Sequence, residues 1–394
     1  MFTERNMEEQ GCCSMIRRPD MIMIGSTSRN TGKTEFACAL IRRYASSVPV
    51  VGVKITTIAK ADATTCPRGG QGCGVCTSVE GRFSLLEEED ASLAKDTSRM
   101  LKAGAHRVLW LRVLHEYLLE GIEALLAAIE EGSAIICESN SARTVVEPGV
   151  FLMIQKRGLA AVKPSACELM HLADQVVTFD PTGWDFSPEL CSFDKKTWSA
   201  RFAASAAILA GGQSLRMKQD KGLLPICGQP LIAHIAKQLT PVFPEVLVSS
   251  NEKDKYAFLG LPIVADQTPG QGPLMGILSC LKAARYDRVL IVACDIPTID
   301  ISFVRQLIRL SQDADIAIPL SEGGRHEPLL AVYRKSVIPR AEALLAGGKR
   351  RVVELFDGLV VKKIGMPSDW YRNLNTPEDL EDLCHPRERG SDKL

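Results

Sequence analysis

The sequence predicts an α/β protein made of two Rossmann-like, three-layer domains. Short runs of Val, Ile and Leu alternate along the chain with longer segments whose apolar residues recur at helical spacing. Nearly unbroken apolar strands of this kind are typical of parallel sheets that helices cover on both faces. At 394 residues, the chain also has the length of two ordinary domains.

Each half of the chain repeats this alternation. In the first half, apolar runs predict strands over 21–25, 48–56, 107–113, 133–139, 151–155 and 175–179, and helical spacing predicts helices over 34–45 and 115–132. In the second half, strands are expected over 205–211, 245–250, 261–266, 288–295 and 314–320, and helices over 273–284 and 301–312. The two halves therefore have the same α/β style.

The segment 182–200 breaks the alternation with Pro, Gly and charged residues, and it predicts a linker. We therefore expect a first domain over 20–181 and a second over 201–385. The ends of the chain, 1–19 and 386–394, are expected to be disordered tails.

Composition excludes several classes of protein. The chain has 47 Lys and Arg against 47 Asp and Glu, so a large basic face for nucleic acid is not expected. We find no apolar run of the roughly 18 residues that a membrane helix needs, and no apolar core of a secretory signal near the start. We expect a cytoplasmic protein that binds neither nucleic acid nor membrane.

The segment GSTSRNTGKT at 25–34 follows an apolar strand and precedes a predicted helix. This order is typical of a phosphate-binding loop, in which backbone amides, a lysine and a Mg²⁺-binding hydroxyl hold a nucleotide. The strict pattern would require glycine at position 27, where Thr27 stands. We expect a nucleotide site with Thr34 on Mg²⁺, and its binding residues are Asn30, Thr31, Gly32, Lys33 and Thr34. The alternative is a chance Gly-Lys-Thr at a helix start.

A second glycine-rich segment, AAILAGGQSLRMKQDKGLLP at 206–225, follows the first strand of the second half. Gly211 and Gly212 lack a Cβ, which allows a phosphate to approach the backbone closely. Arg216 and Lys221 would supply positive charge for a triphosphate. Asp295 ends an apolar strand, and its carboxylate is the kind of ligand that Mg²⁺ prefers. The alternative is a plain strand-to-helix turn with solvated charges.

The string LAGGQSLRMKQDKGLL resembles the signature LAGGxSxRMGxDKxL of the molybdenum cofactor guanylyltransferases (MobA type). Four later segments resemble family motifs in the same order. The first ends in Asn251, the second contains Asp266, the third contains Asp295, and the fourth is NLNTPEDL at 373–380. The resemblance implies a nucleotidyltransferase fold over 203–385 and catalytic residues Arg216, Lys221 and Asp295. It implies that the nucleotide is bound by Leu209, Ala210, Gly211, Gly212, Ser214, Lys221, Asn251, Asp266 and Asp295.

This resemblance implies transfer of GMP from Mg²⁺-bound GTP to molybdopterin, with release of pyrophosphate. Molybdopterin insertase, apo-molybdoenzymes and a second copy of the chain are the candidate partners. Two departures from the family pattern, Lys218 in place of glycine and the segment 324–337, leave the base and the acceptor open. Cytidylyl transfer, another nucleotidyl transfer, and a non-catalytic GTP-dependent molybdopterin carrier are the alternatives.

The first half resembles the molybdopterin-guanine dinucleotide biosynthesis adaptors (MobB type), which bind GTP through a P-loop NTPase-like domain. KDTSRMLKAGAHRVLWL resembles a family segment that supplies Asp96 and Arg99, and SAIICESNS resembles a strand that supplies the acidic residue Glu138. The histidines of the family's second strand are absent. The resemblance covers 20–180 and implies a helper domain that binds GTP, so the chain would be a fusion of the two families.

A cysteine-rich segment, CPRGGQGCGVC, lies at 66–76. Cys66, Cys73 and Cys76 have the spacing and the glycine-rich surroundings of ligands for zinc or an iron–sulfur cluster. Cys12, Cys13 or a second subunit would supply the fourth ligand. The alternative is a loop of free thiols, as expected in a reducing compartment.

Elemental analysis tests this metal hypothesis directly. We predict that protein prepared without oxygen carries zinc or iron near the stoichiometry of one site per chain, because thiolates are the preferred ligands of both. The double substitution Cys73→Ser and Cys76→Ser should remove the metal. Metal-free wild-type protein would contradict the hypothesis.

Overall fold

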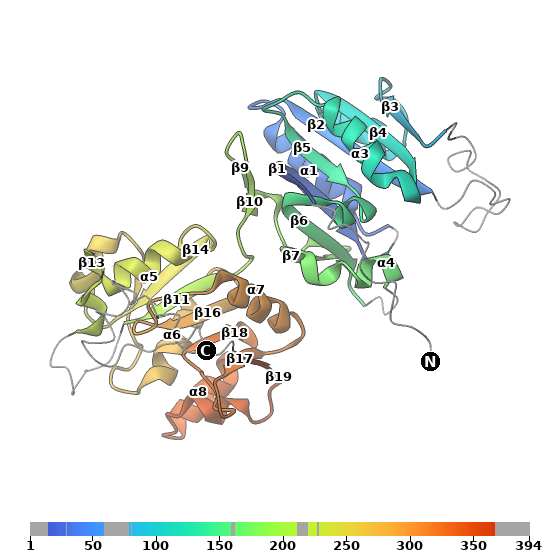
Figure 1. The fold of residues 1–394 in the computed structure, drawn as a ribbon. Helices are drawn as coiled ribbons and strands as arrows, with labels where there is room; N and C mark the ends of the chain where they lie inside the picture. Colours follow the sequence, from blue (N-terminus) through green and yellow to red (C-terminus); the bar gives the residue numbers. More distant parts are fainter. Residues whose placement is uncertain are drawn as a thin grey trace, which may run out of the picture. The chain divides into compact units, whose positions relative to one another are not determined.

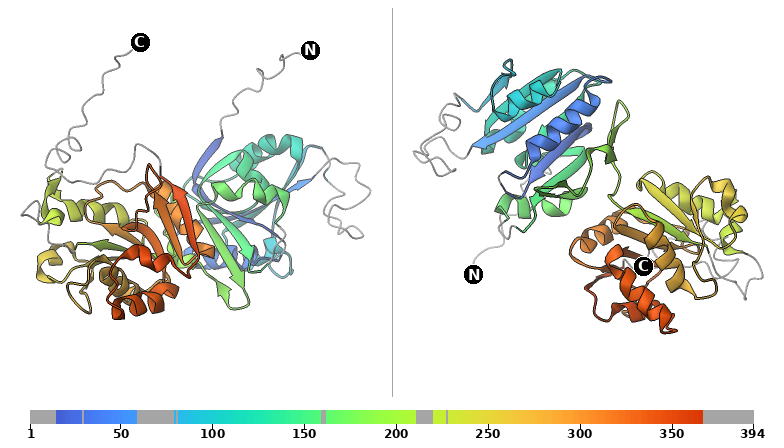
Figure 2. Two further views of the ribbon diagram at one scale, coloured as in Figure 1. Left: turned by 90° about the horizontal axis from the view of Figure 1, so that it is seen from below. Right: turned by 180° about the vertical axis from the view of Figure 1, so that it is seen from behind.

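The computed structural model describes residues 15–28, 30–58, 79, 81–158, 162–210, 220–226 and 228–366. The chain divides into two compact units, Met1–Ala200 and Arg201–Leu394. Both units are α/β, as predicted, and Figures 1 and 2 show a sheet with helices on its faces in each. None of the helices in the described parts of the chain combines the length and apolar character that crossing a membrane requires.

The sheet of the first unit is mostly parallel. Among the described residues its strands are β1 (Ile16–Ser26), β2 (Val50–Ile58), β3 (Phe83–Glu87), β4 (Arg107–Leu114), β5 (Ala134–Glu138), β6 (Val146–Lys156), β7 (Gln175–Asp180) and β8 (Gly183–Trp184), in the order β3-β4-β2-β5-β1-β6-β7-β8. The edge strands β3 and β8 run antiparallel to their neighbours, which differs from the purely parallel sheet expected. β8 must be antiparallel because its connection to β7 is far too short for a crossover.

Helices cover both faces of this sheet. The helices are α1 (Lys33–Tyr44), α2 (Asp96–Lys102), α3 (Leu118–Ala127) and α4 (Pro164–Cys167). Met21 and Met23 of β1 share an apolar cluster with Leu118 and Ile122 of α3, whereas α1 packs with α2. Since successive side chains of a strand point to opposite faces, β1 is apolar on both sides and forms the centre of the unit.

The segment expected as a linker is an ordered part of the first unit. It holds β8 and a hairpin of β9 (Cys191–Phe193) and β10 (Trp198–Ala200). Phe186 and Trp198 are buried. Their rings lie 6.2 Å from Phe36 and 5.0 Å from Tyr44 of α1, respectively. Apolar burial of these aromatic rings fixes the segment to the first unit, which extends to residue 200.

The second unit has a mixed sheet. Within the described residues its order is β15-β14-β11-β16-β18-β17-β19, made of β11 (Ser205–Leu209), β14 (Glu245–Ser249), β15 (Ile263–Val264), β16 (Arg288–Ala293), β17 (Ile316–Leu320), β18 (Leu330–Arg334) and β19 (Val361–Gly365). β18 runs antiparallel to both neighbours, contrary to the parallel sheet expected. The connection 321–329 from β17 is too short for the crossover that a parallel pair needs.

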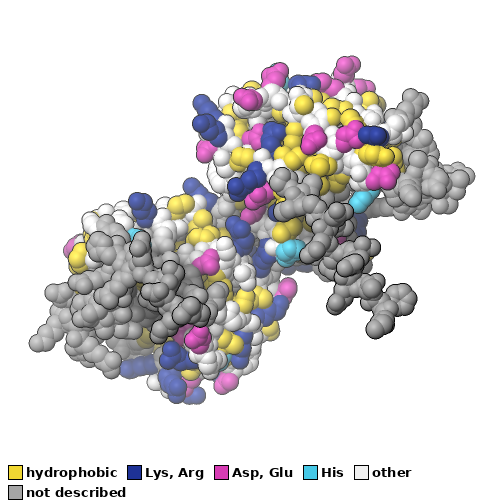
Figure 3. Space-filling model, in the orientation of Figure 1, with side chains coloured by type: hydrophobic (Ala, Val, Ile, Leu, Met, Phe, Trp, Pro, Cys, Tyr) yellow, Lys and Arg dark blue, Asp and Glu magenta, His cyan; other side chains and the backbone are white. Residues whose placement is uncertain are grey.

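Helices also cover both faces of the second sheet. α5 (Leu231–Leu239) and α7 (Ile301–Leu310) bury apolar residues in one core. α6 (Pro273–Ala283) and α8 (Ile338–Ala346) contribute to the core on the opposite face. A short hairpin of β12 (Pro225–Ile226) and β13 (Gln229–Pro230) precedes α5. On the face seen in Figure 3, acidic and basic side chains of the described residues are interspersed.

A close backbone approach in the first unit generates a stability prediction. Gly149 of β6 has no side chain, and a Cβ there would lie 2.2 Å from the carbonyl oxygen of Pro19 and 3.1 Å from that of Trp198. We predict that Gly149→Ala destabilises this unit by about 1–3 kcal/mol, because backbone atoms must move to relieve the clash.

Urea unfolding of the full chain measures this effect. Gly365→Ala in β19 is the control, since a Cβ at Gly365 meets no atom within 4 Å. Equal, near-zero changes in the two variants would contradict the predicted clash.

Candidate functional site

The carboxyl ends of three parallel strands meet at one edge of the second sheet. Leu209 of β11 pairs with Ser249 of β14 on one side and with Ala293 of β16 on the other. The backbone continues this alignment past the strands, because the amide of Ala210 donates to Ser249 O at 3.0 Å and that of Cys294 donates to Leu209 O at 3.1 Å. Residues that follow these strands are therefore neighbours at the edge where open α/β sheets bind ligands.

Lys221 and Asp295 form an ion pair at this edge. Lys221 Nζ lies 3.2 Å from Asp295 Oδ2, and the side chains are 20% and 26% exposed. Lys221 begins the short 3₁₀ helix η5 (Lys221–Leu223), and Asp295 follows β16. The structure thus joins two residues that the sequence predicts as catalytic, although 73 residues separate them. Partial exposure leaves both groups accessible to a ligand.

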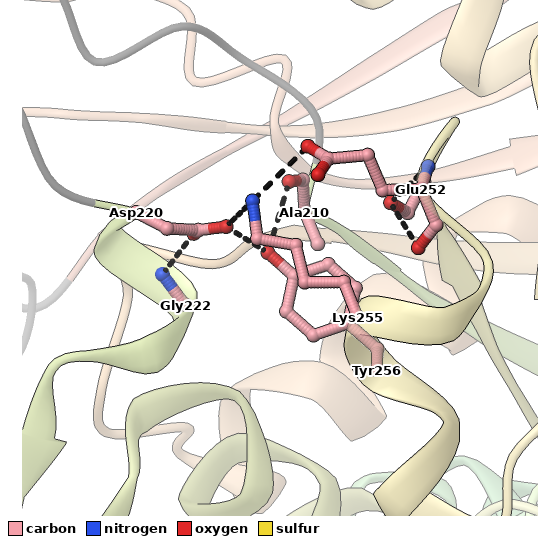
Figure 4. A network of polar contacts seen from close by, with 7 residues as sticks. Ala210, Asp220, Gly222, Glu252, Lys255 and Tyr256 are labelled. Atoms are coloured by element: carbon pink, nitrogen blue, oxygen red, sulfur yellow. Dashed lines mark hydrogen bonds and ion pairs between the residues drawn. The ribbon is translucent and has the colours of Figure 1, made fainter.

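A polar network surrounds the residue before Lys221. Asp220 Oδ1 accepts from the amide of Gly222 at 2.9 Å, and Oδ2 accepts from Tyr256 Oη at 2.7 Å (Figure 4). Lys255 also pairs with Asp220 Oδ2, and with Glu252 at 3.0 Å. Burial opposes ionisation of Asp220, but the hydrogen bonds from Lys255 and Tyr256 outweigh it and lower its pKa. Asp220 is therefore a partly buried anion held by several donors.

Asn251 and Asp266 contact each other at the end of β14. Asn251 Nδ2 donates to Asp266 Oδ2 at 3.0 Å, and Asn251 Oδ1 accepts from the amide of Asp266 at 2.8 Å. Both residues were predicted to contact the nucleotide. The reciprocal pair fixes the orientation of the Asn251 amide.

The first unit contains a cavity of about 1050 Å³ at the start of α1. It is lined by the predicted residues Asn30, Thr31, Gly32, Lys33, Thr34, Asp96, Arg99 and Glu138, together with Lys54, Asn140 and Lys163 among others. A volume of this size is sufficient for a nucleotide-sized ligand. The N-terminus of α1 faces it, and the amide dipoles there favour an anion.

Four charged side chains interact around Thr34 in this cavity. Lys54 Nζ pairs with Asp96 Oδ2, and Thr34 hydrogen-bonds with both Asp96 and Glu138. Burial raises the pKa of Glu138 against the opposing attraction of Lys33 and Lys54. Burial also lowers the pKa of Lys33, partly offset by Glu138. A phosphate beside Lys33 would compensate its lost hydration.

The backbone explains the missing glycine of the phosphate loop. Within the described residues, Asn30 (φ 53°) and Gly32 (φ 76°) are the loop positions with left-handed backbone, whereas Thr27 is not. Thr27 instead donates its amide to Ile154 O and accepts from the amide of Lys163. Position 27 therefore does not need glycine. Position 32 favours glycine because its backbone is left-handed, and a Cβ there would also lie 3.0 Å from the ring of Phe179.

Several predicted residues lie outside the described residues. These are Gly211, Gly212, Ser214 and Arg216 of the second glycine-rich segment, and the cysteines Cys66, Cys73 and Cys76. In the part of the chain that the structure describes, no group of three or more His, Cys, Asp or Glu side chains could hold a metal ion. Leu209 and Ala210 lie at the end of β11, beside the Lys221–Asp295 pair.

The structure adds to both candidate sites residues that the sequence did not predict. In the second unit these are Asp220, Lys255 and Tyr256. In the first unit, Asn140 exchanges two hydrogen bonds with the backbone of Ser26, at 2.8 and 2.9 Å, and fixes the end of β1. Asp220 stands beside Lys221 in the glycine-rich string, which was the available sign of its importance. Tyr256 and Asn140 carry no comparable sequence pattern.

Comparison with known proteins identifies the second unit. Residues 206–360 match the MobA-like NTP transferase domain. A probable molybdenum cofactor guanylyltransferase from Carboxydothermus hydrogenoformans is 40% identical over 187 residues, covering 45% of this chain and 94% of that protein. The molybdenum cofactor guanylyltransferase of Serratia proteamaculans is 37% identical over 188 residues, covering 46% of this chain and 94% of that protein.

A solved structure from Archaeoglobus fulgidus, molybdopterin-guanine dinucleotide biosynthesis protein A, is 23% identical with a TM-score of 0.40. It covers 45% of this chain and 96% of that chain.

The matched domain and the strand-edge site define a nucleotidyltransferase. Through its second unit, the chain belongs to the molybdenum cofactor guanylyltransferase family. The resemblance found in the glycine-rich string is thereby confirmed for this half of the chain. The matched region does not include the first unit, so the adaptor resemblance stays a prediction.

Proposed function

We propose that the second unit transfers GMP from GTP to molybdopterin, giving molybdopterin guanine dinucleotide and pyrophosphate. The observation that carries this proposal is the Lys221–Asp295 pair at the edge formed by β11 and β16, in a chain of this family. The relatives' names indicate that the transferred group is guanylyl and that the acceptor is the molybdenum cofactor. The geometry supplies a cation and a carboxylate at the edge where a nucleotide would lie.

In the proposed reaction, a terminal phosphate oxygen of molybdopterin attacks the α-phosphorus of GTP. A new P–O bond forms, the bond from the α-phosphorus to the bridging oxygen breaks, and pyrophosphate leaves with the electron pair. Lys221, and Arg216 by its place in the signature, would stabilise negative charge on the leaving group. Asn251 and Asp266 would orient the nucleoside, and the glycines would allow close approach of the backbone.

Asp295 is the residue that would hold Mg²⁺. Its carboxylate is 26% exposed at the strand end, which suits an ion that keeps several waters and takes one or two carboxylates with substrate phosphates. The bound ion would neutralise phosphate charge. Lys221 would then exchange its contact with Asp295 for one with phosphate.

We also propose that the first unit is a GTP-binding helper domain with a P-loop. Its support is the cavity in which Lys33, Thr34 and Glu138 meet at the N-terminus of α1. Lys33 would bind phosphate oxygens, and Thr34 would bind a second Mg²⁺, with Glu138 holding its water shell. The proposed role of this unit is to aid delivery or activation of the cofactor.

Asp295→Asn tests the proposed transfer. The substitution keeps the volume of the side chain and removes the negative charge that would hold Mg²⁺. We predict that pyrophosphate release falls by on the order of 10²-fold or more, with the fold intact.

Asp357→Asn is the matched control, because Asp357 is exposed and lies away from the strand edge. Turnover like the wild type in Asp295→Asn would contradict the assignment. If the wild-type chain releases pyrophosphate with CTP but not with GTP, the result supports the cytidylyl alternative. If it releases no pyrophosphate with any nucleotide, the result supports a non-catalytic carrier.

Lys33→Ala tests the helper site. Loss of a charged hydrogen-bond donor should weaken GTP binding at the first unit by about 10–100-fold. In equilibrium binding, the number of tight GTP sites per chain should fall from about two to one, while transfer is retained. Lys102→Ala, an exposed lysine of α2, is the control. Two tight sites in Lys33→Ala would contradict a P-loop function for Lys33.

A further inference from the structure

Tyr256 is a buried residue that lies between the end of β11 and the start of η5. Its side chain is 0% exposed. The hydroxyl donates to Asp220 Oδ2 at 2.7 Å, and its oxygen also lies 3.4 Å from the carbonyl oxygen of Ala210 (Figure 4). Ala210 is the residue after β11, and Asp220 precedes η5. One phenol therefore contacts the residues on both sides of the glycine-rich segment.

Asp220 connects Tyr256 to the backbone segment that contains Lys221. Its other oxygen, Oδ1, accepts from the amide of Gly222 and caps η5. Lys221 lies between these two hydrogen-bonded residues, so its backbone position depends on the orientation of the Asp220 carboxylate. Packing is close at this point, because a Cβ at Gly222 would lie 3.1 Å from Tyr256 Oη. The contact of Lys221 with Asp295 thus depends on a fixed support.

Lys255 completes the support by pairing with Asp220 Oδ2. The carboxylate therefore receives hydrogen bonds from a cation, a phenol and a backbone amide. Such charge-assisted hydrogen bonds are stronger than neutral ones, and a network of them limits the movement of the carboxylate. Removing one donor leaves a partly buried anion with fewer partners, which favours rearrangement of η5.

We propose that Tyr256 and Asp220 are positioning residues that hold Lys221 at the strand edge, beside Asp295, for nucleotidyl transfer. The inference rests on the proposed function of the Lys221–Asp295 pair. Neither residue touches the reacting atoms. Their contribution is preorganisation, since a misplacement of a charge-stabilising group by about 1 Å costs on the order of 10²-fold in rate.

Tyr256→Phe in the full chain tests this inference, because it removes only the hydroxyl and keeps the ring. We expect kcat for pyrophosphate release from GTP and molybdopterin to fall by about tenfold or more, with KM for GTP changed less than about twofold. Asp220→Asn, which keeps the volume, should produce the same pattern. Tyr44→Phe is the control, since Tyr44 Oη likewise donates to a backbone carbonyl, that of Cys191, in the first unit.

A double-mutant cycle separates positioning from a general structural role. If Tyr256 acts through Lys221, Tyr256→Phe should cost less than about twofold in a Lys221→Ala background. A full additional loss there, or unchanged kcat in Tyr256→Phe, would overturn the inference.

Amide hydrogen exchange provides a readout that does not depend on activity. Exchange at the Gly222 amide should be faster in Tyr256→Phe than in the wild type, because the Asp220 cap is loosened. Unchanged exchange would overturn the inference even in an active enzyme. A wild-type chain that releases no pyrophosphate would overturn the proposed function, while the exchange result would still decide whether Tyr256 supports η5.

Discussion

The alignment of three parallel strand ends is the constraint on which the proposed transfer site depends. Because β11 pairs in register with β14 on one side and β16 on the other, the chain segments that leave these strands start side by side. Ala210, Asn251 and Asp295 each follow one of these strand ends and therefore leave the sheet at the same edge. The residues proposed to bind the nucleotide are dispersed in the sequence because each strand end contributes one or two of them, as in other open α/β sheets.

Both units use the same electrostatic arrangement. In the second unit, Lys221 contacts Asp295, and in the first, Lys33 and Lys54 lie among Asp96 and Glu138. Lys54 and Lys221 each form an ion pair with a carboxylate, and Glu138 attracts Lys33 in its partly dehydrated place. A phosphate bound together with a divalent cation would take the place of these carboxylates as the partner of each lysine. The net charge of the site would then change little. The shared arrangement of lysines and carboxylates suits the proposal that one chain holds two nucleotide sites with different roles.

The sequence was sufficient to predict the α/β class, the apolar strands and the strand-end residues, because burial and short motifs determine them locally. It did not predict β18 as an antiparallel strand, since the direction of that strand depends on the length of the connection 321–329. It marked 182–200 as a linker from Pro, Gly and charge, although Phe186 and Trp198 bury their rings in the first unit. Tyr256 could not be selected, because its role arises from contacts with Ala210 and Asp220, which are distant in the sequence.

The central claim is that this chain makes a guanine dinucleotide of molybdopterin. The most direct measurement supplies the purified full chain with molybdopterin, Mg²⁺ and one nucleoside triphosphate at a time, and identifies the product by mass. The account predicts molybdopterin guanine dinucleotide and an equal amount of pyrophosphate with GTP, and little product with CTP, ATP or UTP. A product that carries another nucleotide, or molybdopterin that remains unmodified with GTP, would contradict it.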